Sequence, residues 1–218
     1  MATLVVPSPK SGGVDAYIRR AGASQTRNYG AATSLMLQSA SATSFDRMLI
    51  SFDLSSIPTG STINSATLTV TNALNSMAGA QSCTCYPLTR VLVEGTGNGT
   101  VSGDGATWLT HDGTNSWTTA GGDYDAANGS AFSVSDLDIL GTTYAWTITA
   151  AVAAAFVANV GGNKVIPLLF RLDTEGGATG SYAIYSSDHT TDANRPYLTV
   201  DYTSPGGMLR RNGGLFIG

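Results

Sequence analysis

Aromatic side chains gather in one glycine-rich segment of the sequence, residues 94–131. Trp108, Trp117 and Tyr124 lie there, and the flat faces of such rings pack well on the pyranose rings of sugars. These three residues are candidates for a glycan-binding platform. The alternative, which we favour, is that they form the core of a long segment that otherwise has little apolar surface to bury.

The same segment contains four aspartates that are candidate calcium ligands, because calcium prefers carboxylate oxygen. They are Asp104, Asp112, Asp123 and Asp125. Their spacing does not match an EF-hand loop, and the alternative is that they are ordinary solvated aspartates. Calcium is the only cofactor that the sequence suggests. The two cysteines and the two distant histidines lack the spacing of a zinc site.

Two short stretches contain the residue types of a hydrolase triad. They are His111-Asp112 and Ser187-Asp188-His189. Neighbouring residues do not make a triad, which needs separate loops and an oxyanion hole. The sequence also lacks a Gly-x-Ser-x-Gly elbow. We therefore expect no enzymatic activity.

The last residues, 204–218, are too apolar for a free chain end. Pro205 and two glycines separate them from the last expected strand. An isolated apolar peptide needs a partner surface, so we expect this tail to dock on a neighbouring subunit or a capsid protein. The expected docking residues are Met208, Leu209, Arg210, Arg211, Leu215, Phe216 and Ile217.

The elements expected to carry these residues are short β-strands. Residues 47–54 and 62–72 alternate in polarity around a Pro-Thr-Gly turn, which predicts an antiparallel pair with one wet face. Many such runs recur over residues 14–203, which is typical of a sandwich, while residues 1–13 read as an extended arm. The alanine-rich run 149–159 is the one good helix candidate, with Thr149 as its N-cap.

Composition limits the function classes. The chain has 218 residues, 12% of them charged, and a net charge of −4, so nucleic-acid binding is not expected. No run of 18 apolar residues predicts a membrane span, and the first residues do not resemble a secretory signal peptide. Cys83 and Cys85 are expected to be free thiols, since positions i and i+2 of a strand lie at the edge of disulfide geometry.

Four features in a fixed order resemble the DNRLRE domain family, the disaggregatase-related repeats, over roughly residues 14–203. In chain order they are Asp15-Ala-Tyr-Ile-Arg before Asn28-Tyr-Gly, then the strand with Arg47 and Phe52-Asp-Leu-Ser-Ser-Ile-Pro-Thr-Gly, then Leu88-Thr-Arg with Glu94-Gly-Thr-Gly followed by Gly105-Ala-Thr-Trp108 and Trp117 before Gly121-Gly-Asp, and last Tyr185-Ser-Ser-Asp with Arg195-Pro-Tyr-Leu-Thr-Val-Asp-Tyr. The resemblance implies an all-β, jelly-roll β-sandwich of antiparallel strands with one short helix. It also implies a kinship with secreted surface modules, some of them carbohydrate-binding modules that include alginate binders.

Three functions remain open at this point: a virion protein, which we favour, a carbohydrate-binding module, and a fragment of a secreted adhesin or polysaccharide-degrading enzyme. The first is a non-enzymatic phage virion protein, a capsid decoration (cement) or displayed accessory protein. It would form a homo-oligomer or contact the major capsid protein and would be located on the virion. The alternative is an extracellular carbohydrate-binding module that recognises a polysaccharide at the cell surface. In each case Arg47, Arg171 and Arg195 are interpreted as structural residues that pair either with a carboxylate, for which Asp53, Asp173 or Asp201 are candidates, or with a backbone carbonyl.

Overall fold

The computed structural model of the chain describes residues 1–7, 14–177 and 179–205. These residues form an antiparallel, all-β fold with a single short α-helix, as the sequence predicts. The strands are β1 (Ala2–Pro7), β2 (Val14–Arg20), β3 (Ser34–Ser41), β4 (Ser44–Asp53), β5 (Thr62–Asn75), β6 (Gln81–Pro87), β7 (Ser130–Val134), β8 (Thr143–Thr147), β9 (Val165–Leu172), β10 (Gly180–Tyr185) and β11 (Tyr197–Thr203).

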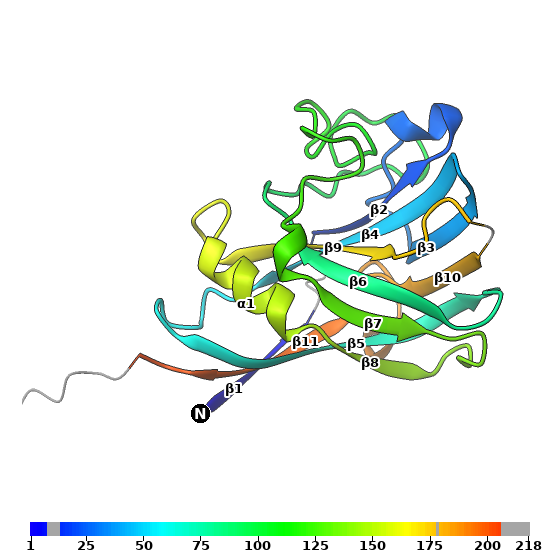
Figure 1. Ribbon diagram of the computed structural model, residues 1–218. Coiled ribbons are helices and arrows are strands. Elements are labelled where there is room, and N and C mark those ends of the chain that lie inside the picture. The colour runs from blue at the N-terminus through cyan, green and yellow to red at the C-terminus, as the bar shows by residue number, and fades with distance from the viewer. Residues whose placement is uncertain (8–13, 178, 206–218) are drawn as a thin grey trace, which may run out of the picture.

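The strands make one sheet that curls on itself into a jelly-roll-like sandwich (Figure 1). Strand β5 connects the two walls, because it pairs with β11 and β8 along one part and with β10 at its end. The opposite wall continues through β3, β4, β9, β6 and β7, with β2 beside β4. Apolar side chains of both walls, among them Phe52, Leu68 and Phe170, form the main core.

Helix α1 (Thr149–Ala158) packs against β5 and β9. The prediction that Thr149 caps this helix is wrong. Ile148 occupies the N-cap position without a side-chain bond, and the Thr149 hydroxyl accepts a hydrogen bond from the backbone N–H of Ala66. The Ser130 hydroxyl instead accepts a hydrogen bond from the N–H of Ala151, so a residue of β7 satisfies a donor of the first turn.

Strand β4 is buried on both faces, which corrects the prediction of one wet face. Residues 45–52 are all buried. Met48 and Ile50 enter the main core, whereas Phe45 and Leu49 belong to a second apolar cluster on the outer face of the sheet. The second cluster forms because the long segment between β6 and β7 folds back over this face.

That covering segment, residues 88–129, has no strand or helix longer than the three-residue 3-10 turn Ala126–Asn128. Leu88, Leu92 and Trp108 of the segment pack on Leu49 and Leu169 of the sheet. In Figure 1 the segment forms the green coils above β2 and β4. The segment therefore has its own apolar base, which fixes its loops relative to the strands.

Asn28 ties this segment to the rest of the domain through three side-chain hydrogen bonds, and a fourth is local, from the N–H of Gly30. Its side-chain amide is fully buried and donates to the carbonyls of Glu94 and Ala106 at 2.6 and 2.9 Å. Its Oδ1 accepts from the N–H groups of Gly30 and Gly97 at 3.1 and 2.8 Å. A side chain at Gly30 would clash with the Glu94 carbonyl, so glycine is required for this close approach.

Glu94 gives the fold a pH dependence. Burial is the main cause that raises the pKa of its carboxyl from 4.5 to about 8. The nearby carboxylates of Asp15 and Asp188 also raise this pKa, whereas the hydrogen bond from the N–H of Asp15 lowers it. The folded state therefore holds one more proton than the unfolded state between these two values, and the free energy of unfolding should fall as pH rises from about 4.5 to about 8. In thermal melts over that range, Glu94→Gln is expected to flatten the profile and raise the melting temperature at pH 8. The exposed control Asp136→Asn should keep the slope, and an unchanged slope in Glu94→Gln would contradict the assignment.

The chain ends differ from one another. Residues 2–7, in the expected arm, form the edge strand β1, which pairs with β11 from Ala2 opposite Tyr202 to Pro7 opposite Tyr197. The predicted docking residues 208–217 lie outside the described residues.

Cys83 and Cys85 are buried, free thiols, as expected.

Candidate functional site

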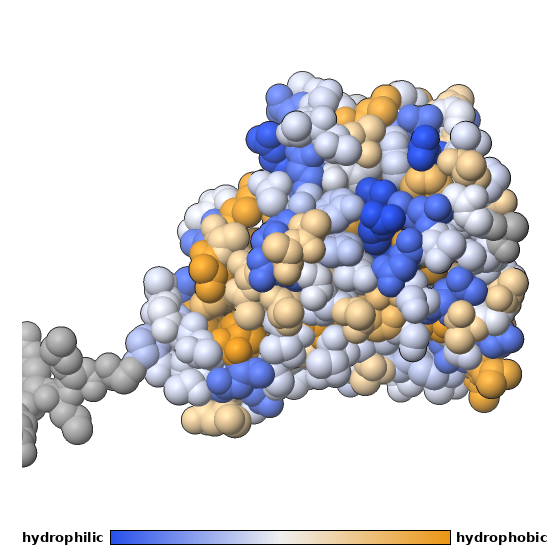
Figure 2. Space-filling view, viewed as in Figure 1, coloured by the Kyte–Doolittle hydropathy of each residue, from blue (hydrophilic) through white to orange (hydrophobic). Residues whose placement is uncertain are grey.

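Two hollows open beside the 118–122 turn: one is lined by residues of β2, β4 and nearby loops, and the other entirely by the 88–129 segment. The Arg20 hollow, about 760 Å³, is lined by Arg20, Gln25, Ala42, Phe45, Arg47, Trp108, Thr119, Ala120, Glu175 and Gly176. The Tyr124 hollow, about 610 Å³, is lined by Thr89, Arg90, Thr118, Thr119, Gly122, Asp123, Tyr124 and Ala126. Both volumes lie in the range of ligand-binding clefts. Figure 2 shows strongly hydrophilic side chains gathered on the face that overlies β4 and β9.

The floor of this face is a chain of contacts across β4 and β9. Arg47 makes a two-point ion pair with Glu175, with N–O distances of 2.6 and 2.7 Å. Arg171 contacts the same carboxylate at 2.9 Å and donates to the Tyr124 hydroxyl at 2.8 Å. Glu175 is therefore the acceptor for both arginines, and the expected acceptors Asp53 and Asp173 are wrong for these two. Arg195 pairs with Asp192 instead.

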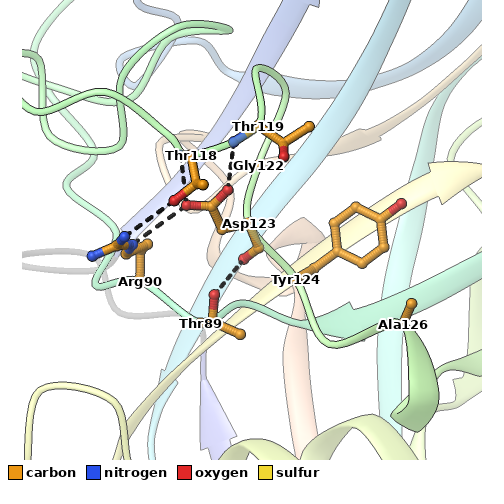
Figure 3. Close-up of a pocket in the computed structure, with 8 residues that line it drawn as sticks. All are labelled: Thr89, Arg90, Thr118, Thr119, Gly122, Asp123, Tyr124 and Ala126. Atoms are coloured by element: carbon orange, nitrogen blue, oxygen red, sulfur yellow. Dashed lines mark hydrogen bonds and ion pairs between the residues drawn. The ribbon is translucent and has the colours of Figure 1, made fainter.

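Asp123 holds the turn that separates the hollows (Figure 3). Its carboxylate accepts hydrogen bonds from the N–H groups of Thr118 and Thr119, both at 2.8 Å, and faces Arg90 at 3.3 Å. Burial acts to raise the pKa of Asp123, but these donors outweigh it and lower the pKa below its ordinary value. A permanently charged carboxylate thus fixes the backbone of the turn.

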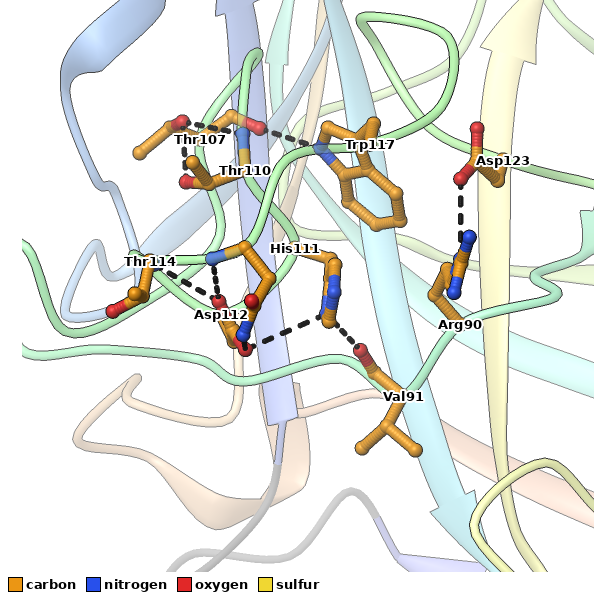
Figure 4. Close-up of polar contacts among 10 residues, drawn as sticks. Arg90, Val91, Thr107, Thr110, His111, Asp112, Thr114, Trp117 and Asp123 are labelled. Carbon is orange, nitrogen blue, oxygen red and sulfur yellow. Dashed lines mark hydrogen bonds and ion pairs between the residues drawn. The ribbon is translucent and has the colours of Figure 1, made fainter.

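The three aromatic residues singled out in the sequence do not form one platform. Trp117 is 4% exposed, and its ring N–H donates to the Thr107 carbonyl (Figure 4). Trp108, also 4% exposed, packs edge-on against Phe45 and reaches the wall of the Arg20 hollow. Tyr124 is half-buried in the other hollow, beside the Tyr86 ring. The two tryptophans thus form part of the second core, which is the alternative that the sequence favoured.

The four candidate calcium ligands stay apart. Each carboxylate accepts hydrogen bonds from its own loop: Asp104 from Thr96, Asp112 from Thr114 and Asn115, Asp123 as above, and Asp125 from Ala127 and Asn128. Within the described ranges, no group of three or more His, Cys, Asp or Glu side chains is placed to share a metal ion. These aspartates act as turn-stabilising acceptors.

The residues with triad letters are not assembled into a triad. His111 lies between the Val91 carbonyl, at 3.1 Å, and Asp112, at 3.9 Å (Figure 4). Ser187 is buried, and its N–H donates to Asp15. His189 contacts Thr191, and its ring is tilted by 44° against the Tyr185 ring. No serine hydroxyl contact with either histidine is present among the described residues.

Residues that the sequence analysis missed give the site its charge. Arg20 contacts the Phe45 ring, with its guanidinium carbon 5.0 Å from the ring centre. Gln25 and Glu175 line the same hollow from other loops. Arg47 and Arg171 both pair with the single carboxylate of Glu175, and Arg20 lines the same hollow, which leaves positive charge on this face of a chain with a net charge of −4.

Comparison with known proteins places the chain in a family of carbohydrate-binding modules. Residues 11–202 match the model of carbohydrate-binding module family 96. A search of the curated proteins finds no match. Within the part of the chain that the structure describes, no helix is both long and apolar enough to cross a bilayer. Because the match extends over most of the sequence, the chain belongs to carbohydrate-binding module family 96.

Proposed function

We propose that this protein binds an acidic polysaccharide, without turning it over, through the Arg20 hollow. The observation that supports this most directly is the Arg20 guanidinium, which lies over the Phe45 ring and, among the described residues, makes no side-chain hydrogen bond or ion pair. An arginine in a cleft beside an aromatic ring is well suited to a carboxylate or sulfate, because its planar group donates two parallel hydrogen bonds. Gln25 and Thr119 supply further polar groups for sugar hydroxyls.

Family membership supports glycan binding, and the local charge supports an acidic glycan. Glu175 is already shared by Arg47 and Arg171, so it does not neutralise Arg20 as well. A neutral glycan would leave this positive charge without a counterion in the bound state. The virion function stays a prediction that depends on the tail, and the family match favours the carbohydrate alternative.

The test is the binding of polygalacturonate and polymannuronate, with dextran as the neutral control, measured by isothermal titration calorimetry. Arg20→Gln is expected to weaken binding to a polyuronate about tenfold, the effect of losing one charge-assisted hydrogen bond. Arg27→Gln removes the same charge from an exposed residue that lies outside both hollows, so it controls for long-range electrostatics. Equal binding of dextran and the polyuronates, or equal losses in the two variants, would overturn the proposal.

A further inference from the structure

The two hollows share a wall, because Thr119 lines both of them. We propose that one glycan chain crosses the 118–122 turn and occupies both hollows at once, so that the module recognises the interior of a polysaccharide and not its end. This inference rests on the proposed function and adds a second subsite to it.

The turn between the hollows is a low ridge. Thr118, Thr119 and Ala120 carry small, exposed side chains, and two glycines follow them. Gly121 adopts a φ of +96°, and a side chain there would clash with the Trp108 ring, so the backbone itself lies close against the base. No bulky side chain of the ridge therefore separates the two hollows.

The ridge is also rigid, because it is held from both sides. Arg47, on the side of the Arg20 hollow, donates to the Gly121 carbonyl at 2.7 Å. Asp123, on the side of the Tyr124 hollow, accepts from Thr118 and Thr119. A glycan that crosses the ridge meets a preformed surface, which lowers the entropic cost of binding.

The floor beneath the ridge is continuous. Tyr124 in one hollow contacts Arg171, which contacts Glu175 in the other. The two hollows are thus two parts of one surface, built on β4, β9 and the 88–129 segment.

The hollows differ in charge, and this difference assigns them different roles. In the Tyr124 hollow, Arg90 is paired with Asp123, and the remaining polar groups are threonine hydroxyls beside the Tyr124 ring. This is a surface for uncharged sugar faces and hydroxyls. The Arg20 hollow keeps its positive charge. A short acidic oligomer should therefore bind at the Arg20 hollow first, and a longer one should gain contacts across the ridge.

Exposed alanines allow each hollow to be obstructed without removing a contact. Ala42 lines the Arg20 hollow and Ala126 lines the Tyr124 hollow. Ala127 lies next to Ala126 on the surface and lines neither, so Ala127→Trp is the matched control for Ala126→Trp. The probes are oligogalacturonates and oligomannuronates, from disaccharides to octasaccharides, with calorimetry as the readout and thermal melts to confirm folding.

Affinity is expected to rise with length by about tenfold or more and then level off once the oligomer spans both hollows. Ala42→Trp should weaken every length. Ala126→Trp should leave the short oligomers unaffected and remove the gain with length, while Ala127→Trp behaves as the unmodified protein. Octasaccharides blocked at both ends by a bulky fluorophore should still bind.

Three results would each overturn the inference while leaving the proposed function in place. One is an affinity that does not change with length, and another is an octasaccharide whose binding is lost when its ends are blocked. The third is binding of long oligomers by Ala126→Trp at the unmodified affinity, which would exclude the Tyr124 hollow as a subsite. If no uronate oligomer or polymer binds at all, the proposed function fails together with the inference.

Discussion

Asn28→Ala is expected to lower the free energy of unfolding by about 3–5 kcal/mol, the sum for several buried backbone groups that lose their partners. The variant leaves the carbonyls of Glu94 and Ala106 and the N–H groups of Gly30 and Gly97 without the Asn28 amide. Water does not easily replace the Asn28 amide as the partner of these groups, because Asn28 is fully buried. Glycan binding should be lost with stability, since the 118–122 turn belongs to the segment that Asn28 anchors.

The measurement is urea denaturation followed by tryptophan fluorescence, which reports on Trp108 and Trp117 in this segment together with Trp146 in the main core. Asn98→Ala is the matched control, because Asn98 is an exposed asparagine four residues after Glu94. We expect that control to stay within about 0.5 kcal/mol of the unmodified protein. Similar midpoints for the two variants would show that Asn28 is not the anchor.

The motifs that resemble a known family turn out to meet at this anchor. Asn28 and Gly30 surround the Glu94 carbonyl, a side chain at Gly105 would also clash with that carbonyl, and Asp15 accepts from Ser187. All of these motifs except the one that carries Arg47 and Phe52 thus meet at one structural node. This explains why the sequence predicted the fold well: the strands follow from two-residue alternation, and the node residues follow from buried hydrogen bonding and close backbone approach.

The site was harder to predict for a physical reason. Its lining comes from β2, β4, the 88–129 segment and the loop after β9, and periodicity within one strand does not reveal which loop covers which strand. Trp108 and Tyr124 were singled out by residue type, yet only the fold shows that they line different hollows. Neither Arg20 nor Glu175 lies in a sequence motif that marks it as a binding-site residue. The sequence does not show that the 88–129 segment packs over β4, and the site could not be predicted without that contact.

The second large effect is expected at Glu175, whose carboxylate is 7% exposed and is shared by two arginines. Glu175→Gln should lower the free energy of unfolding by about 3–5 kcal/mol, as is typical when one partner of a buried ion pair is removed. The Arg47 side chain is only 10% exposed, so its charge would be left without compensation in a largely dry site. Asp173→Asn, at an exposed carboxylate on the same strand end, is the control and should cost about 1 kcal/mol or less.

A double variant separates the stability of this pair from its function. Arg47→Met with Glu175→Met removes both charges, so the uncompensated charge of the single variant disappears and part of the stability should return. The recovery is expected to be incomplete, because the Gly121 carbonyl loses the Arg47 donor and Arg171 loses its carboxylate partner. Polyuronate binding by the double variant should remain weaker than that of the unmodified protein even if stability recovers. The reason is that the 118–122 ridge loses the hydrogen bond from Arg47 to the Gly121 carbonyl. A double variant that regains both stability and full binding would mean that Arg47 and Glu175 serve the fold alone, and that Arg20 does not depend on a ridge fixed from below.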